Sequence, residues 1–296
     1  MPVHRSKPLR QCLERHMATS WTEETIETGP ALATPVRVYR SGDVGSGPMP
    51  LVLHLHGGAF IDGSLDTGRV IPTLLAEAGA TVVSVDYPHA PKHRFPLALQ
   101  TAFGALKWLH KSRGRWSNRK SHLFVAGEEA GGNLAAGLAL MVRDQQMPPL
   151  AGQILLSPML DPRMATCSMR QAEAGPVGCK WADGWHEYLG TPDKAAHPYA
   201  EPMASSRLAG LAPALILTAE DDLLRDESLN YARRLRASGV TVDQHVLPAP
   251  TGWPCAFTNP TPADASWTMA VRERFDAFLA QKLDALRPIP LHPTQA

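Results

Sequence analysis

The chain has 296 residues, of which 44% are hydrophobic, and its formal net charge is +1. A chain of this length and apolar content can bury one large core, so we expect a single domain over residues 1–296. Lysine, arginine and acidic residues are mixed without a basic stripe, which argues against nucleic acid or an anionic membrane as partner. We therefore expect a small-molecule substrate or ligand, neutral or weakly charged, and leave open assembly into a homodimer.

The start of the chain and its cysteines bear on location and on metal content. Residues 1–7 lack the apolar core of a signal peptide, and no stretch approaches the roughly 20 apolar residues of a membrane span. This predicts a cytoplasmic protein with no membrane span. The cysteines are widely spaced, without a CxxC pair or a histidine at metal-ligand spacing: Cys12, Cys167, Cys179 and Cys255. We expect reduced thiols, no metal site and no cofactor.

Apolar, β-branched runs alternate with helical patterns along most of the chain. The runs that predict strands are 35–39, 51–55, 81–85, 123–126, 153–156, 214–218 and 240–247. The helical patterns between them are 69–78, 97–111, 132–143, 226–238 and 263–283. This order predicts an α/β fold with a mostly parallel sheet, helices on both faces and ligand chemistry at the carboxyl ends of the strands.

Two segments do not fit this alternation. Residues 1–28 are polar and weakly helical in pattern, and residues 162–190 are rich in Met, Cys and Trp. Long insertions beside the carboxyl edge of such a sheet often cover binding sites, so we expect both segments to form a small cap. The tail, 287–296, is rich in proline and is expected to be frayed.

The most informative motif is a catalytic turn whose central residue has been replaced. After the apolar run Phe124-Val125-Ala126 the chain reads Gly127-Glu128-Glu129-Ala130-Gly131 and enters a small-residue helix. Gly-x-Ser-x-Gly in this context is a nucleophile elbow, a strained turn that projects a serine hydroxyl. Here the serine position is Glu129, so the turn for acyl-transfer chemistry is kept and its attacking hydroxyl is absent.

Further motifs carry a family resemblance. His54-Leu55-His56-Gly57-Gly58-Ala59-Phe60 resembles the His-Gly-Gly-Gly stretch that supplies oxyanion-hole amides in lipases and esterases. Additional matches occur at 63–67, 85–96, 157–161 and 218–227. From about residue 35 to residue 283 the chain resembles the bacterial hormone-sensitive-lipase-like esterases, which are α/β-hydrolases. The resemblance implies the α/β-hydrolase fold with a helical cap.

The resemblance also implies where the catalytic triad would lie. The acid maps to Asp222, which is retained, and the nucleophile maps to Glu129. The histidine would lie in the loop 247–257, at Thr251, Gly252 or Cys255 depending on where a gap is placed, and none of these is histidine. Two of the three triad members are therefore missing.

The missing residues weaken the case for ordinary ester hydrolysis. A seryl mechanism needs a hydroxyl, and a base that also activates water. What the family pattern retains is an anion-binding pocket of amides near Gly58, Ala59 and Ala130, next to the positive end of a helix. Cys255 lacks a histidine neighbour that would lower its pKa, so we interpret it as a packing residue rather than a new nucleophile.

Two interpretations of Glu129 stay open. In the first, burial raises its pKa and it acts as an acid or base on a small carbonyl or ester-like molecule, in lyase, cyclase or isomerase chemistry, helped by a shared proton with a nearby Asp222. In the second, Glu129 occupies the oxyanion pocket as a resident anion and the protein is an inactive pseudo-hydrolase or ligand-binding protein. Carboxylester hydrolysis by family similarity is a further alternative. Glu128, and His56 beside Gly57 in the oxyanion loop, are expected to have structural roles.

Overall fold

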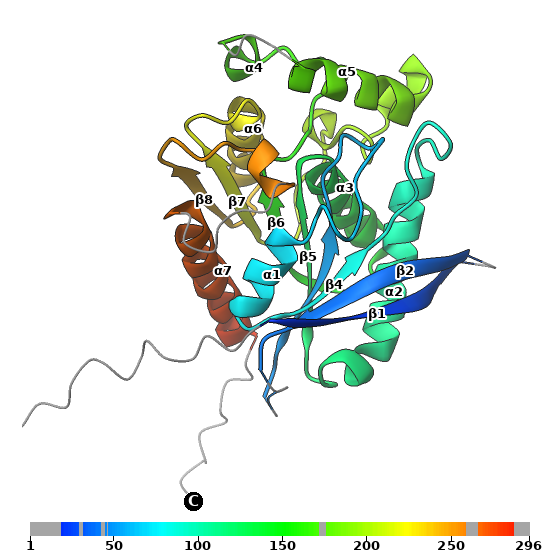
Figure 1. Ribbon diagram of the computed structural model, residues 1–296, viewed down its shortest axis with the longest axis vertical. Coiled ribbons are helices and arrows are strands. Elements are labelled where there is room, and N and C mark those ends of the chain that lie inside the picture. Colours follow the sequence, from blue (N-terminus) through cyan, green and yellow to red (C-terminus); the bar gives the residue numbers. More distant parts are fainter. Residues whose placement is uncertain are drawn as a thin grey trace, which may run out of the picture.

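The computed structural model describes residues 19–29, 32–42, 45, 47–171, 176–258 and 266–286, and an eight-stranded sheet forms its centre (Figure 1). The strands are β1 (Ser20–Gly29), β2 (Leu32–Arg40), β3 (Pro50–Leu55), β4 (Thr81–Val85), β5 (His122–Glu128), β6 (Leu150–Leu156), β7 (Ala214–Ala219) and β8 (Val242–Leu247). Their order is β1-β2-β4-β3-β5-β6-β7-β8. β2 is antiparallel to both of its neighbours, and the six strands from β4 to β8 run parallel. The predicted mostly parallel sheet is confirmed.

Helices cover both faces of this sheet. α1 (Val70–Glu77) and α7 (Ser266–Ala285) pack together on one face, and α2 (Leu97–Trp116), α3 (Glu129–Gln145) and α6 (Arg225–Ala237) lie on the other (Figure 1). Because both faces are covered, the inner strands are apolar almost throughout: β3, β4 and β7 are buried at every position.

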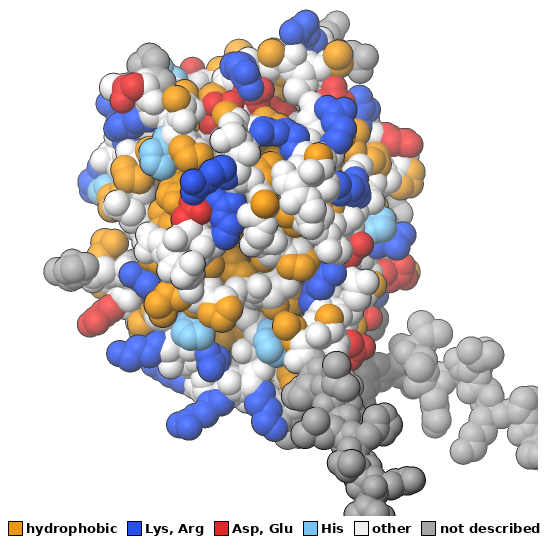
Figure 2. Space-filling model, turned by 180° about the vertical axis from the view of Figure 1, so that it is seen from behind, with side chains coloured by type: hydrophobic (Ala, Val, Ile, Leu, Met, Phe, Trp, Pro, Cys, Tyr) orange, Lys and Arg blue, Asp and Glu red, His pale blue; other side chains and the backbone are white. Residues whose placement is uncertain are grey.

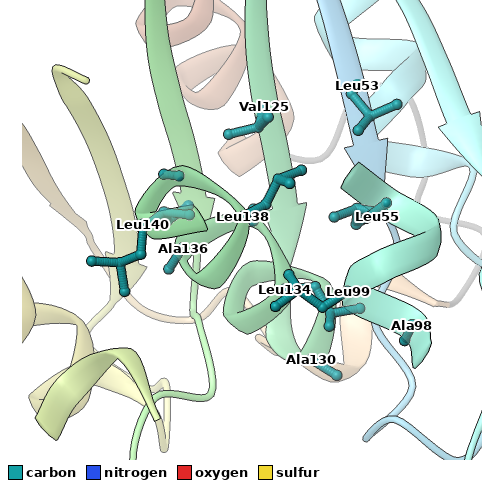
Figure 3. Packing of buried hydrophobic residues seen from close by; sticks show 14 of the residues in the cluster. Leu53, Leu55, Ala98, Leu99, Val125, Ala130, Leu134, Ala136, Leu138 and Leu140 are labelled. Atoms are coloured by element: carbon teal, nitrogen blue, oxygen red, sulfur yellow. The ribbon is translucent and has the colours of Figure 1, made fainter. Parts of the chain in front are cut away.

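The core beside the site is formed mainly by α3 and its neighbours. Leu134 and Leu138 of α3, Leu99 of α2 and the strand residues Leu55 and Val125 fill the space between the helices and the sheet (Figure 3). All five side chains are fully buried. This packing fixes the start of α3, and with it the turn that carries Glu129.

The expectation that residues 1–28 contribute to a cap is wrong for their described part. Ser20–Gly29 is instead an edge strand paired antiparallel to β2. Ile26 and Thr28 are buried while Glu23, Glu24 and Glu27 stay more exposed, so a period-two pattern decides the structure of this polar segment. Residues 1–18, with Cys12, and the tail 287–296 lie outside the described residues.

The segment 162–190 is helical over most of its described length. It contains α4 (Cys167–Gln171) and α5 (Pro176–Leu189), which lie together at one end of the molecule (Figure 1). The short helices η2 (Pro192–Ala196) and η3 (Pro202–Ala204) follow, and η4 (Cys255–Phe257) lies between β8 and α7. Residues 172–175, and 263–265 of the expected last helix, are not among those described.

Within the described ranges, no helix combines the length and apolar character needed to cross a membrane. The described side chains likewise contain no group of three or more His, Cys, Asp or Glu residues arranged to hold a metal ion.

Candidate active site

The turn between β5 and α3 carries Glu129 in a strained backbone conformation. Its φ of +53° is uncommon for a residue with a side chain. The turn tolerates no bulk beneath it, because a methyl group on Gly131 would overlap the Leu55 carbonyl oxygen and one on Gly127 would overlap Gly131. The glycine spacing therefore has a direct steric cause.

The Glu129 carboxylate is buried, with a residue exposure of 8%, and both oxygens accept hydrogen bonds. The Gly58 amide donates to Oε2 at 2.5 Å, and the indole Nε1 of Trp181 in α5 donates to Oε1. Burial raises the pKa of Glu129, and the donors Trp181 and Gly58 partly oppose that rise. The carboxylate thus lies between the oxyanion loop and the cap helix.

The oxyanion loop has an unusual backbone conformation. Gly58 has a φ of +127°, and Ala59 and Phe60 also have positive φ, at 53° and 65°. His56 is fully buried, its Nδ1 contacts the Gly57 carbonyl oxygen at 2.8 Å, and its ring stacks on Tyr87. Burial lowers the pKa of His56 to about 3, so the imidazole is neutral near pH 7 and supports the loop rather than titrating.

The amides of Gly58, Ala59 and Ala130 were expected to form an anion pocket. Of these three, the Gly58 amide donates to the Glu129 carboxylate. Ala59 and Ala130 are fully buried beside it, but among the described contacts neither amide is hydrogen-bonded to Glu129. The neighbouring Gly57 amide donates instead to Glu128, at 3.1 Å.

Glu128 belongs to a separate buried network. Its Oε2 lies 2.7 Å from His54 Nε2, whose Nδ1 in turn lies 2.9 Å from the Ser84 hydroxyl. With the Gly57 amide on its other oxygen, Glu128 connects β5 with β3, β4 and the oxyanion loop. Its contacts are those of a structural residue that positions the loop.

Asp222 is equally buried but has different partners. Its Oδ2 accepts from the hydroxyls of Ser157 at 2.5 Å and Thr218 at 2.6 Å, and its Oδ1 accepts from the Leu224 amide at 2.9 Å. Burial raises its pKa, against the lowering effect of these donors. Among the described contacts no hydrogen bond joins Asp222 to Glu129, so the structure provides no shared proton between them.

The loop that would carry the histidine is held by the adjacent acid, Asp221. Its carboxylate accepts from the Thr251 amide and hydroxyl, both at 2.7 Å, and from the Gly252 amide at 3.0 Å. Although burial acts in the opposite direction, the donors Gly252 and Thr251 lower the pKa of Asp221. Gly252 has a φ of +70°, and Cys255 is an exposed free thiol at the start of η4.

The cap closes over Glu129. Trp181 is 1% exposed, and Gly184 packs so closely on the Ala59 carbonyl that a methyl group there would overlap it. Phe60 stacks on Tyr188 of α5 at 4.0 Å between ring centroids, and Lys180 forms an ion pair with Asp62 at 3.0 Å. The main hollows on the described surface, of about 250 to 1060 Å³, are lined by neither Glu129, His56 nor Asp222.

The sequence motifs gave Asp221 no role of its own, and they left Trp181 as a core or cavity residue of the cap without connecting it to Glu129. The doublet Asp221-Asp222 offered a signal, because two adjacent acids can serve two different partners. No local pattern ties Trp181 to Glu129, since 52 positions separate them in the chain.

Comparisons with known proteins agree with the observed fold. Residues 52–251 match the family profile described as alpha/beta hydrolase fold. The carboxylic ester hydrolase LipN of Mycobacterium tuberculosis is 37% identical over 228 residues, which span 74% of this chain and 60% of LipN. A gibberellin receptor of Arabidopsis thaliana is 30% identical over 230 residues, or 70% of this chain and 67% of the receptor.

A solved structure supports the same similarity. The crystal structure of a thermostable esterase from Pseudomonas putida superposes with a TM-score of 0.78 at 32% identity, covering 88% of this chain and 83% of the esterase.

Proposed function

The chain belongs to the alpha/beta hydrolase fold family, and on that premise we propose that it recognises a small ester-like or carbonyl compound without forming a seryl acyl-enzyme. One observation carries the proposal. Where the elbow would present a hydroxyl, the Glu129 carboxylate lies between the Gly58 amide and the Trp181 indole. An oxyanion or a carboxylate product of ester cleavage would need the same kind of donors.

This position makes Glu129 an internal occupant of the anion pocket. For the Gly58 amide to polarise a ligand carbonyl, the ligand must displace the Glu129 carboxylate. Because the Trp181 indole also donates to this carboxylate, the cap helix must move when Glu129 is displaced. Binding therefore requires a ligand that offers its own acceptor to both donors. Small carboxylates, esters and related carbonyl compounds meet that requirement.

The relatives support the ligand class but differ in what they are named for. LipN and the Pseudomonas putida esterase are named for ester hydrolysis, whereas the Arabidopsis relative is named as a receptor for gibberellin. Carboxylester hydrolysis in this chain would need another nucleophile and base, because Glu129 replaces the hydroxyl and Thr251 is bound to Asp221.

A second candidate function is acid–base turnover of the same compounds by Glu129. The observation in its favour is that burial raises the pKa of Glu129, which favours the protonated form that a general acid needs. Lyase, cyclase or isomerase chemistry would use such a proton on a carbonyl held by the Gly58 amide.

The first experiment asks whether seryl chemistry is present. We expect no turnover of short p-nitrophenyl esters and no labelling by a fluorophosphonate probe, because the elbow supplies no hydroxyl. Saturable turnover together with stoichiometric labelling would contradict the proposal. Ester turnover that is resistant to the probe but lost in Glu129→Gln would favour the second candidate.

The second experiment tests the anion pocket itself. Glu129→Ala removes the internal carboxylate and frees the donors of Gly58 and Trp181, so acetate should raise the melting temperature of this variant and change its tryptophan fluorescence. Wild type should respond weakly. Glu187→Ala, which removes a more exposed carboxylate of the same helix as Trp181, is the control. Equal acetate responses in all three proteins would argue against a pocket at Glu129.

A further inference from the structure

A hollow lined by basic side chains lies at the C-terminal end of α2, away from the turn at Glu129. Its volume is about 1060 Å³, and its lining includes Lys107, His110, Lys111, Arg113, Arg115 and Arg119. An adjoining hollow of about 320 Å³ shares His110, Arg113 and Arg119, and adds Lys120 and His122. No aspartate or glutamate lines either hollow. We call these two hollows together the basic groove.

The position of the groove can be followed on the surface. Basic side chains gather at the lower end of the face shown in Figure 2, together with histidines and a few apolar side chains. The end of α2 lies at the lower part of the molecule in Figure 1, and Met147 and Pro148 contribute the apolar part of the lining.

Most of these cations have no acidic partner. Arg115 pairs with Glu24, but in the described structure no ion pair joins a carboxylate to Lys107, Lys111, Arg113, Arg119 or Lys120. Arg113 donates from Nε to the Arg119 carbonyl oxygen at 3.0 Å and contacts His110 Nδ1 at 3.0 Å. Its guanidinium is therefore fixed in place by neutral acceptors and keeps its charge uncompensated.

The two histidines respond to this charge. The pKa of His110 is lowered by burial and then by the positive charge of Arg113, and the same two causes lower the pKa of His122. Both shifts favour the neutral imidazole next to the cations. A bound anion would relieve the repulsion among the cations, of which Arg115 alone has a carboxylate partner among the described residues.

We propose that the basic groove binds a small soluble ligand that carries two or three linked phosphate groups. Guanidinium and ammonium groups are the side chains best suited to phosphate oxygens. The volume suits a compact ligand of that kind. A single-stranded nucleic acid is disfavoured, because no Phe, Tyr or Trp lines either hollow to stack on a base.

Inorganic tripolyphosphate is the probe that tests this site. Calorimetry at low ionic strength should show saturable binding to the full chain, weakening as salt is added. Amide resonances of residues 107–120 should shift on titration, while those around Glu129 should not. Ester-type activity plays no part in this test, so its outcome is independent of the proposed function.

Two charge-matched double variants locate the binding. Lys111→Gln/Arg119→Gln removes two exposed, unpaired cations of the groove and should weaken tripolyphosphate binding at least about tenfold, the effect expected for lost charge-assisted contacts. Lys92→Gln/Arg233→Gln removes two exposed cations elsewhere and should leave the affinity within about twofold of wild type. Circular dichroism checks that both variants fold.

Each alternative outcome overturns the proposal. Absence of tripolyphosphate binding by wild type at low salt would do so, as would an equal loss of affinity in both double variants. Binding that is confined to vesicles of phosphatidylglycerol, or to a single-stranded oligonucleotide, would assign the groove to a membrane surface or to nucleic acid instead.

Discussion

The two sides of the site hold their carboxylates with different partners. On the elbow side, the strained turn and the oxyanion loop remain, and a carboxylate occupies the place of the hydroxyl. On the acid side, Asp222 remains, but the loop that would carry the histidine is tied to Asp221. On the elbow side a carboxylate is bound by the oxyanion loop and the cap helix, and on the acid side a carboxylate binds the loop after β8.

The difference shows what each geometry depends on. The elbow is fixed by glycine packing and by the Glu128–His54 pair, neither of which requires a serine. On the acid side, Asp222 accepts from Ser157 and Thr218, and the amides of the loop after β8 have Asp221 as their acceptor.

The largest effect is expected from Glu128→Ala, which removes the support of the elbow side. It leaves the fully buried His54 and the Gly57 amide without their acceptor, and each buried polar group left unsatisfied costs about 1–3 kcal/mol. Urea unfolding measures the loss. Glu187→Ala, which breaks a more exposed ion pair, should cost under about 1 kcal/mol. Similar losses in both variants would show that Glu128 does not hold the elbow.

A smaller effect, which depends on pH, is expected from Glu129→Gln. Because the folded-state pKa is raised, the folded protein keeps a proton that the unfolded chain releases above its ordinary value of 4.5. Wild-type stability therefore falls as pH rises through that window, by at most about 1.4 kcal/mol per pH unit, and the uncharged variant escapes this loss.

The measurement is the free energy of unfolding of wild type and Glu129→Gln between pH 4 and pH 8. The variant should gain relative to wild type as pH rises, on top of a constant cost from one altered hydrogen bond. A difference that is flat with pH would show that burial does not govern the ionisation of Glu129.

On the acid side, Asp221→Ala should cost about 1 kcal/mol, because the Thr251 amide and hydroxyl lose their acceptor while water can replace it at the exposed Gly252 amide. Hydrogen exchange should become faster in residues 249–257 and stay unchanged around Glu129. Asp221→Asn, which keeps one acceptor oxygen, should fall between the two proteins. Faster exchange on both sides would show that the two halves of the site are coupled.

The smallest effect is expected from Lys180→Ala. Its ion pair with Asp62 is exposed on both sides, at 44% and 69%, and such pairs contribute little, so stability should change by under about 0.5 kcal/mol. Trp181→Phe keeps the apolar packing of the cap but removes the donor to Glu129, and should be the more disruptive of the two. The reverse order would mean that the cap is held at its surface.

Local sequence patterns determined the sheet, the principal helices and the altered elbow. Alternating apolar runs mark buried strands, and a glycine on each side of Glu129 marks a turn that no side chain can crowd. Both signals lie within a few residues of the structure that they specify. Local patterns give the wrong expectation at Ser20–Gly29, where a polar segment becomes a strand because β2 offers an edge to pair with.

Only the tertiary structure decided which groups meet. Trp181 reaches Glu129 because a cap helix folds over the turn, and Asp221 rather than Asp222 holds Thr251 because of how the loop after β8 returns to the sheet. The net charge of +1 likewise conceals a local basic groove, since its cations come from the end of α2 and the loop after it, and no acidic residue lines it. Contacts between distant segments depend on three-dimensional packing, which the spacing of residues along the chain does not encode.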